Sequence, residues 1–158
     1  MAEEPAVKHP RSRLDEIDKK IIRILQTDGR MQFSKLGPLV DLSPAAARQR
    51  VLQLIEDDVI SFVAVTDPTA TGQLAQAMVG IKVQGDIDRV LEGVEAHPEV
   101  VYLVLTAGRF DLLAEIVCTN TDRLMEVLQG IRMQTGVLYA EVFTYLRLAK
   151  QTYNWGVS

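Results

Sequence analysis

The first third of the chain carries apolar residues at helical spacing. From Leu14 to Leu25 they recur at i, i+3, i+7, i+10 and i+11, which places them on one face of a helix. Acids cluster at the start of this stretch and basic residues follow them, the order that the helix dipole favours. Asp28-Gly29 then supplies a stop signal, so the pattern predicts an amphipathic helix that ends there.

Two further helices and a strand are predicted after this one. A short helix is expected from Gln32 or Ser34 to Val40, and a third begins at Ser43, a good N-cap, with Pro44 at its first position. The third helix buries Ala47, Val51, Leu54 and Ile55. Residues 59–66 are β-branched and aromatic, which predicts a strand. Three helices and a strand predict a winged helix-turn-helix.

The second half of the chain has a different rhythm. Strands are expected over residues 77–83, 100–106, 111–118 and 137–148, and apolar helix faces over 87–94 and 124–131. The order β-α-β-β-α-β is the ferredoxin-like arrangement. The predicted fold class is therefore α+β, with an N-terminal winged helix-turn-helix and a C-terminal ferredoxin-like βαββαβ domain.

These elements predict five segments along the chain. They are a flexible arm (1–13), a winged helix-turn-helix domain (14–66), a linker or hinge (67–76), a ferredoxin-like domain (77–150) and a C-terminal tail (151–158).

The predicted strands of the second domain are apolar at both parities. Val101, Leu103 and Leu105 alternate with Tyr102 and Val104, which are also apolar or aromatic. Helices on one face of a sheet cover only half of such a surface, so the other face predicts self-association. The alternative is a monomer with an unusually apolar sheet.

Charge and cysteine content narrow the class of protein. The chain of 158 residues has a net charge of −4, but residues 8–50 hold ten lysines and arginines against five acids. A local basic footprint on an acidic protein is compatible with DNA binding, and a solvated helical surface is the alternative. The only cysteine is Cys118, which suits a reducing cytoplasm, and no apolar run is long enough to span a membrane.

The third helix offers a set of side chains suited to the major groove. Opposite its buried side lie Ala45, Gln49, Leu52 and Gln53, with Ala46 beside them and Arg48 and Arg50 at the two edges. Glutamine can bind adenine, alanine can touch a thymine methyl group, and arginine can bind guanine or phosphate. The helix N-terminus at Ser43 can receive a phosphate. The alternative is a three-helix packing unit without DNA binding.

The chain lacks the residue patterns of an enzyme. His9 and His97 lie far apart, and Cys118 falls within a predicted strand. No Ser/His/Asp set, metal-ligand spacing or phosphate loop is present, so neither a catalytic site nor a metal site nor a cofactor is expected. The second alternative is an oligomeric interaction or ligand-sensing module without specific DNA binding.

In order and spacing, these motifs resemble the Lrp/AsnC, or feast/famine, family of transcription regulators. The resemblance covers residues 14–148. It rests on these motifs: Leu14-Asp15-Glu16-Ile17-Asp18, Asp28-Gly29-Arg30, Leu42-Ser43-Pro44, Arg48-Gln49-Arg50-Val51, Asp67-Pro68, Pro98-Glu99-Val100, Gly108-Arg109-Phe110-Asp111 and Gly136-Val137.

The resemblance implies a protein that binds double-stranded promoter DNA as a homodimer or as an octamer of four dimers. It implies DNA contacts by Arg30 as well as by the third helix. It also implies an amino acid or related metabolite bound between dimers of the second domain. The implied effector residues are Ala107, Gly108, Arg109, Phe110, Asp111, Thr135, Gly136 and Phe143. Asp111 could pair with an amino group, and Arg109 could hold a carboxylate. An ordinary hairpin turn is the alternative for Gly108–Asp111.

The chain departs from the family pattern at several positions. Gly37-Pro38 lies inside the predicted second helix, where proline removes a helical N–H. Asp41 stands where a turn glycine is usual, although aspartate tolerates the left-handed conformation better than most residues. Ala107, Arg109 and Thr135 replace the family's common residues, which puts the identity of the effector in doubt.

Overall fold

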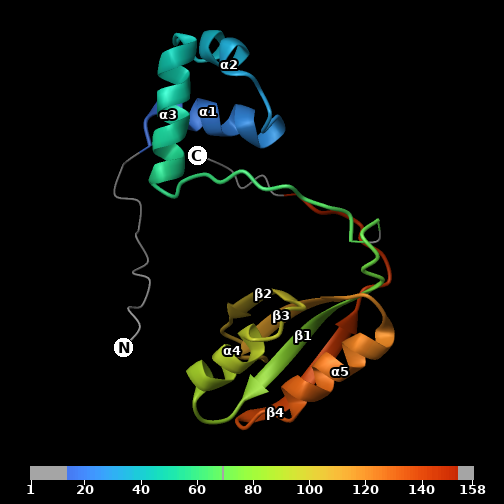
Figure 1. Ribbon diagram of the computed structural model, residues 1–158. Helices are drawn as coiled ribbons and strands as arrows, with labels where there is room; N and C mark the ends of the chain where they lie inside the picture. The colour runs from blue at the N-terminus through green and yellow to red at the C-terminus, as the bar shows by residue number, and fades with distance from the viewer. Residues whose placement is uncertain (1–13, 69, 153–158) are drawn as a thin grey trace. The chain divides into compact units, whose positions relative to one another are not determined.

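The computed structural model describes residues 14–68 and 70–152, so the predicted arm (1–13) and most of the predicted tail lie outside the described residues. Contacts divide the chain into two compact units that hold residues 14–64 and 65–150 (Figure 1). The elements are α1 (Glu16–Thr27), α2 (Phe33–Leu39), α3 (Pro44–Glu56), β1 (Ala75–Val83), α4 (Ile87–Glu95), β2 (Val100–Leu105), β3 (Leu112–Cys118), α5 (Thr121–Arg132) and β4 (Val137–Thr144).

The first unit is a bundle of three helices around a small apolar core. α1 contributes Ile21, Ile22 and Leu25, as the helical spacing predicted. α2 and α3 complete the core with Leu36, Val40, Ala47, Val51 and Leu54. Ser43 is the N-cap of α3 and accepts a hydrogen bond from the Ala46 N–H at 3.2 Å. The predicted start of the third helix is therefore confirmed.

Gly37 explains why the second helix departs from an ordinary helical sequence. A Cβ atom at Gly37 would lie 2.7 Å from the Leu42 carbonyl oxygen and 3.1 Å from the Pro44 nitrogen. Both neighbours are backbone atoms of the turn before α3 and cannot rotate away. The Gly37 carbonyl also accepts hydrogen bonds from the Val40 and Leu42 N–H groups, and Pro38 lies near the end of α2. The glycine lets the turn pack directly on the helix.

The turn itself needs a left-handed residue. Asp41 has φ of +58°, and its carboxylate lies 3.7 Å from the Lys20 ammonium. The expectation that aspartate takes the place of a turn glycine here agrees with this conformation.

The strand predicted over residues 59–66 is absent, and this prediction was wrong. No strand lies between α3 and β1 among the described residues, and Phe62, Val63 and Val65 are exposed. β-branched residues favour extended backbone, but a strand also requires a neighbour to receive its hydrogen bonds. Within this chain the described residues offer none to that segment.

The second unit is a four-stranded antiparallel sheet in the order β2-β3-β1-β4. α4 and α5 lie on the same face of this sheet (Figure 1). The order of elements and the sheet are those of the ferredoxin-like arrangement, so the predicted α+β class and the C-terminal βαββαβ domain are confirmed, whereas the helix-turn-helix lacks its predicted wing strand. β1 begins at Ala75 rather than at Ala77, so it takes up the last residues of the predicted linker.

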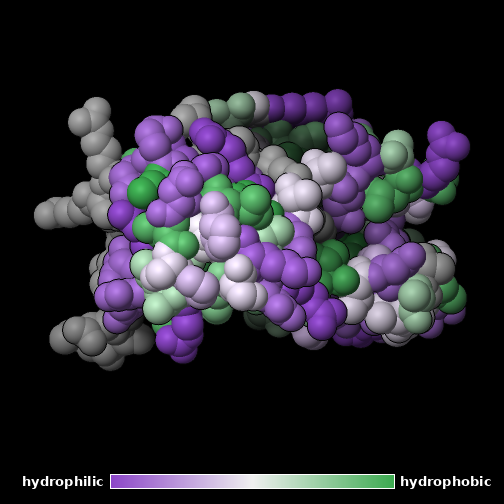
Figure 2. Space-filling model, turned by 90° about the horizontal axis from the view of Figure 1, so that it is seen from above, coloured by the Kyte–Doolittle hydropathy of each residue, from purple (hydrophilic) through white to green (hydrophobic). Residues whose placement is uncertain are grey.

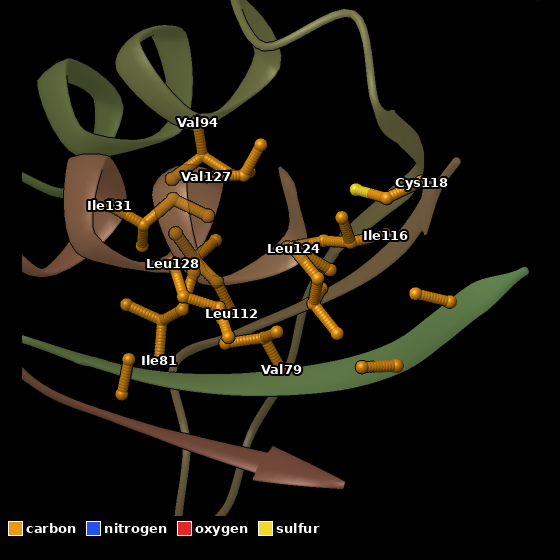
Figure 3. Close-up of a cluster of buried hydrophobic side chains, with 14 of the residues drawn as sticks. Val79, Ile81, Val94, Leu112, Ile116, Cys118, Leu124, Val127, Leu128 and Ile131 are labelled. Atoms are coloured by element: carbon orange, nitrogen blue, oxygen red, sulfur yellow. The ribbon is translucent and has the colours of Figure 1, made fainter. Parts of the chain in front are cut away.

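The core of this unit lies between the sheet and the two helices. Alternate residues of β1 and β3 are buried, among them Val79, Ile81, Leu112 and Ile116. Figure 3 shows Val94 of α4 and side chains of α5 pointing toward these residues. Cys118 is buried at the edge of this cluster, where burial raises the pKa of its thiol.

The opposite face of the sheet carries apolar side chains without a covering layer. Tyr102, Tyr139 and Phe143 are exposed there, each by two-fifths or more. Tyr145 is half-buried on the same side. Its burial, followed by a hydrogen bond with Glu115, raises its pKa to about 12. We refer to this side of the sheet as the open face. Seen from above, in the view of Figure 2, hydrophilic residues surround separate groups of hydrophobic ones.

The last strand is shorter than predicted. β4 ends at Thr144 instead of Leu148, although the Tyr145 N–H still donates to the Gln76 carbonyl at 2.9 Å. Its partner β1 begins at Ala75, so later residues have no strand to pair with. Leu146 and Leu148 are accordingly exposed.

We expect Gly37→Ala to destabilise the helical unit by roughly 1–3 kcal/mol, because the new methyl group would overlap fixed backbone. Alanine would otherwise favour a helix by about 1 kcal/mol, so a loss of stability isolates the clash. Thermal unfolding followed by circular dichroism measures the change. Gly108→Ala is the control, since no heavy atom lies within 4 Å of its added Cβ. Equal melting temperatures for the two variants would contradict this interpretation.

Candidate functional site

The outer side of α3 is the first candidate site. Ala45, Arg48, Gln49 and Leu52 are exposed there, while Ala47, Val51 and Leu54 face the core. The structure thus places the predicted DNA-facing residues on the solvent side of the helix, with Ala46 half-buried beside them. Neither Arg48 nor Gln49 has a hydrogen bond or ion pair to another described residue. These two side chains are available to an external partner.

Two other predicted DNA contacts are already bonded within the chain. The Gln53 amide donates to the Asp57 carboxylate at 3.1 Å. The Arg50 Nη1 atom donates to the carboxylates of Asp15 at 2.6 Å and Asp18 at 2.8 Å. These bonds raise the pKa of Arg50. Arg50 therefore joins α3 to the start of α1 in this structure.

The start of α1 is a capping box. The Asp18 N–H donates to Asp15 at 2.7 Å, and the Asp15 N–H donates to Asp18 at 3.2 Å. The hydrogen bond from the Asp18 N–H, followed by that from Arg50, lowers the pKa of Asp15. Asp15 is thus held ionised beside α3, and the two side chains cap the first turn of α1.

A shallow hollow of about 420 Å³ lies along α3. Its lining residues are Asp18, Ala46, Gln49, Arg50, Gln53, Leu54 and Asp57. Two carboxylates and one arginine give this hollow no excess of positive charge, so it does not offer a phosphate site by charge alone.

Arg30 lies apart from α3, in the loop between α1 and α2. Its backbone N–H donates to the Asp28 carboxylate at 3.0 Å, and the residue is exposed. No hydrogen bond or ion pair among the described residues links Arg30 to the outer side of α3, so its predicted role in DNA binding stays a prediction.

The second candidate site is the loop between β2 and β3. The Thr106 N–H donates to the Asp111 carbonyl at 2.9 Å, and the Thr106 hydroxyl donates to the Phe110 carbonyl at 2.7 Å. The Asp111 N–H donates to Ile81 of β1 at 2.9 Å. The loop is a closed hairpin tied to β1, with Ala107, Gly108 and Arg109 exposed at its tip.

The Asp111 carboxylate has a partner at each oxygen. Lys82 Nζ lies 2.8 Å from Oδ1, and the Val83 N–H donates to Oδ2 at 2.7 Å. The hydrogen bond from Lys82, followed by that from Val83, lowers the pKa of Asp111. An amino group of a ligand would have to compete with Lys82 for this carboxylate.

Phe110 is the centre of an aromatic cluster on the open face. Its ring makes edge contacts with Tyr139 and Phe143 at centroid distances of 6.2 and 6.1 Å. Gly80 lies beneath it, where a Cβ would be 2.6 Å from the ring. The Arg109 guanidinium is 5.3 Å from the Phe110 centroid and 2.8 Å from Glu141. The glycine makes room for the ring and thereby brings three predicted effector residues together.

The remaining predicted effector residues lie at the start of β4. Gly136 has φ of +100°, and its carbonyl accepts a hydrogen bond from the Gln84 N–H at 2.7 Å. Thr135 is exposed. Among the described residues, no ring contact, hydrogen bond or ion pair joins Thr135, Gly136 or Ala107 to the aromatic cluster, so the single chain does not assemble all eight predicted residues into one pocket.

Comparison with known families decides what these two sites belong to. A model of the AsnC-type helix-turn-helix domain matches residues 14–55, and a model of the Lrp/AsnC ligand binding domain matches residues 76–155. The chain belongs to the Lrp/AsnC family.

Curated members of the Lrp/AsnC family match nearly the whole chain. The HTH-type transcriptional regulator FL11 of Pyrococcus horikoshii is 33% identical over 141 residues, which cover 88% of this chain and 93% of the relative. The HTH-type transcriptional regulator AldR of Mycolicibacterium smegmatis is 29% identical over 143 residues, covering 85% of this chain and 84% of the relative.

Two solved structures of the family contain an amino acid. A transcriptional regulator from Neisseria meningitidis in complex with L-methionine has a TM-score of 0.81 at 25% identity, covering 92% of this chain and 97% of that one. A feast or famine regulatory protein from Mycobacterium tuberculosis complexed with L-methionine has a TM-score of 0.83 at 26% identity, covering 92% and 100%.

As a member of the Lrp/AsnC family, the protein is a transcriptional regulator with a helix-turn-helix DNA-binding domain and a ligand-binding domain. Its relatives are regulators and not enzymes. No group of His, Cys, Asp or Glu among the described residues could hold a metal ion. No helix in the described part of the chain is long and apolar enough to cross a membrane.

Sequence reasoning missed the partners of the predicted site residues. Lys82, Tyr139 and Glu141 lie on strands next to the loop between β2 and β3, and Gly80 lies under Phe110. The alternation of β1 and β4 gave a usable signal, because these residues occupy the parity opposite to the buried one. The register that brings them to the loop was not available from the sequence.

We expect Asp111→Asn to lower the melting temperature at neutral pH, because it weakens the bond with Lys82. The folded-state pKa of Asp111 lies below its ordinary value of 3.8. The stabilisation is therefore present above that pH and is lost as the pH falls through the lowered pKa. The difference from wild type should narrow below about pH 4.

Melting temperatures measured from neutral to acid pH test this expectation. Glu92→Gln, which removes an exposed carboxylate of α4, is the control and should shift the melting temperature little at any pH. A difference between Asp111→Asn and wild type that stays constant into acid would contradict the assigned ion pair.

Proposed function

We propose that this regulator recognises specific double-stranded DNA through the outer side of α3. The observation that carries the proposal is that Arg48 and Gln49 are exposed and have no partner among the described residues. Beside them, Ala45 and Ala46 are small enough to let the helix lie deep in the major groove. The N-terminus of α3 at Ser43 would receive a backbone phosphate. Arg30, Arg50 and Gln53 remain predicted contacts.

We further propose that the protein acts as an assembly of identical subunits. The open face carries Tyr102, Tyr139 and Phe143, and segment 59–66 separately exposes further apolar side chains. Burying such surfaces between copies removes apolar area from water. A homodimer, and an octamer of four dimers, would place several α3 helices on one DNA. We place the DNA-binding domain at 14–66 and the effector domain at 77–150, and the predicted hinge at 67–76 gives up its last two residues to β1.

The effector we propose is an amino acid or a related metabolite, bound where C-terminal domains of different subunits meet. Two relatives of similar structure hold L-methionine. In this chain Arg109, whose side chain is 70% exposed, could receive a carboxylate, and Phe110 and Phe143 could contact an apolar side chain. Asp111 could receive an amino group if the ligand displaces Lys82.

The alternative function is an oligomeric interaction or ligand-sensing module without specific DNA binding. It is favoured only by the overall charge of −4, since the exposed side of α3 has no function in that case. We propose that the protein has no enzymatic activity and no cofactor. We also propose that it is located in the cytoplasm.

We expect Arg48→Ala and Gln49→Ala each to weaken binding to operator DNA by roughly fivefold to a hundredfold, because a good base contact contributes about 1–3 kcal/mol. Filter binding to the promoter region of the protein's own gene, titrated with KCl, measures the affinity. Light scattering should show unchanged assembly for both variants. Arg89→Ala, an exposed arginine of α4, is the control. Wild-type binding that does not depend on salt would contradict DNA recognition.

We expect isothermal calorimetry of the full chain against the twenty amino acids to give binding heat for at least one apolar amino acid, with L-methionine the first to try. Arg109→Ala should weaken that binding at least about fivefold if the guanidinium holds the carboxylate. Arg89→Ala should leave the binding unchanged. Absence of heat from every amino acid would remove the sensing proposal and leave the DNA proposal standing.

A further inference from the structure

Arg50 closes a three-residue network that uses every oxygen of two carboxylates. Asp15 Oδ1 caps the Asp18 N–H, and Asp15 Oδ2 accepts from Arg50 Nη1 at 2.6 Å. Asp18 Oδ2 accepts from the Asp15 N–H, and Asp18 Oδ1 accepts from the same Nη1 at 2.8 Å. The arginine thus binds the two carboxylates of the capping box, whose hydrogen bonds already fix the first turn of α1.

The charge of this network disfavours a direct phosphate contact. Two carboxylates and one guanidinium leave a net charge of −1, and both acids lie within bonding distance of the arginine. A phosphate that approached Arg50 would meet the two aspartates as well. Arg48, on the other edge of the exposed side of α3, has no such acidic partners among the described residues. The two arginines of this helix are therefore not equivalent.

The network also gives α3 a directional contact, which the apolar core does not provide. Burial of Ala47, Val51 and Leu54 holds α3 close to α1 and α2, but hydrophobic contact is not directional. A hydrogen-bonded ion pair has a preferred geometry. Because Arg50 lies at the edge of the exposed side of α3, its bonds to α1 restrict rotation of α3 about its own axis. That rotation decides where Gln49 and Arg48 point.

We propose that Arg50 is a positioning residue, which acts through Asp15 and Asp18 to orient α3 for DNA recognition and does not itself contact DNA. The inference rests on the proposed DNA recognition and assigns the predicted contact at position 50 a different role. The two roles give opposite results when the aspartates are changed. A DNA-contacting Arg50 would be released by their loss, whereas a positioning Arg50 would lose its anchor.

The experiment measures operator binding by the full chain with Asp18→Asn, Arg50→Gln and the double variant. Glu16→Gln is the matched control, because Glu16 lies in the same turn of α1 and this substitution removes the same charge. Among the described residues, Glu16 pairs only with Lys19, at 3.0 Å. Affinities for operator and for unrelated DNA are both measured, since their ratio is insensitive to a uniform change in charge. Arg48→Gln provides the comparison for a contacting arginine.

We expect Asp18→Asn to lower the ratio of operator to unrelated binding roughly three- to tenfold relative to Glu16→Gln. Arg50→Gln should lower it by a similar factor, and the double variant by no more than either single one. The slope of log K against log [KCl] should fall by about 0.9 for Arg48→Gln if that arginine meets a phosphate, and should not change for Arg50→Gln. Arg50→Lys should restore the ratio, because a single nitrogen makes both bonds and an ammonium can do the same.

Other outcomes overturn the proposal. If Asp18→Asn raises operator binding as much as Glu16→Gln does, Arg50 does not position α3. If Asp18→Asn raises operator binding more than Glu16→Gln does, or if Arg50→Gln reduces the salt slope, Arg50 contacts DNA. If circular dichroism shows that Asp18→Asn and Arg50→Gln unfold the helical unit under the binding conditions, the network is merely structural. A wild-type protein that prefers no DNA sequence overturns both this inference and the proposed function.

Discussion

The organisation of the second unit depends on two helices that cover only one face of its four-stranded sheet. α4 and α5 bury Val79, Ile81 and Leu112, and this leaves the opposite parity of the same strands to solvent. A strand that must be apolar on one side could be polar on the other. Here the open face instead holds Tyr102, Tyr139 and Phe143. The loop between β2 and β3 folds onto this same face, because Phe110 lies on Gly80 and Lys82 binds Asp111. The proposed assembly and the proposed sensing therefore involve one surface.

The sequence predicted the parts of the fold that depend on local pattern. The apolar face of α1, the Ser43-Pro44 start of α3 and the βαββαβ order all follow from spacing and capping chemistry, and the structure has them. The prediction from sequence failed where a segment needs a neighbouring strand to pair with. Residues 59–66 have the composition of a strand, but no neighbouring strand within the described chain, and β4 stops where β1 no longer lies beside it. Propensity favours extended backbone and does not provide its hydrogen-bond acceptor.

The candidate sites show the same division between residue type and residue role. Composition and helical position identified Arg48, Gln49 and Arg50 together as polar residues around one side of α3. They could not separate Arg50 from the others, because its partners Asp15 and Asp18 are more than thirty residues away along the chain. Resemblance likewise indicated Asp111, but not that Lys82 and the Val83 N–H already occupy its oxygens. A role in a site depends on such tertiary contacts, and these require the register and packing of the folded chain.

The distribution of charge explains why recognition by one subunit would be weak. On α3 only Arg48 is both positive and without a partner among the described residues, while Asp15, Asp18 and Asp57 lie near the same side. Few phosphates can be neutralised by such a surface, so its affinity for DNA of any sequence should be low. Low affinity for unrelated DNA is useful when several identical helices are joined, because each added contact then multiplies the preference for a repeated operator. The apolar open face, which we propose to join subunits, and the sparsely charged α3 are thus complementary features: the first would supply the number of contacts, and the second would keep each one selective.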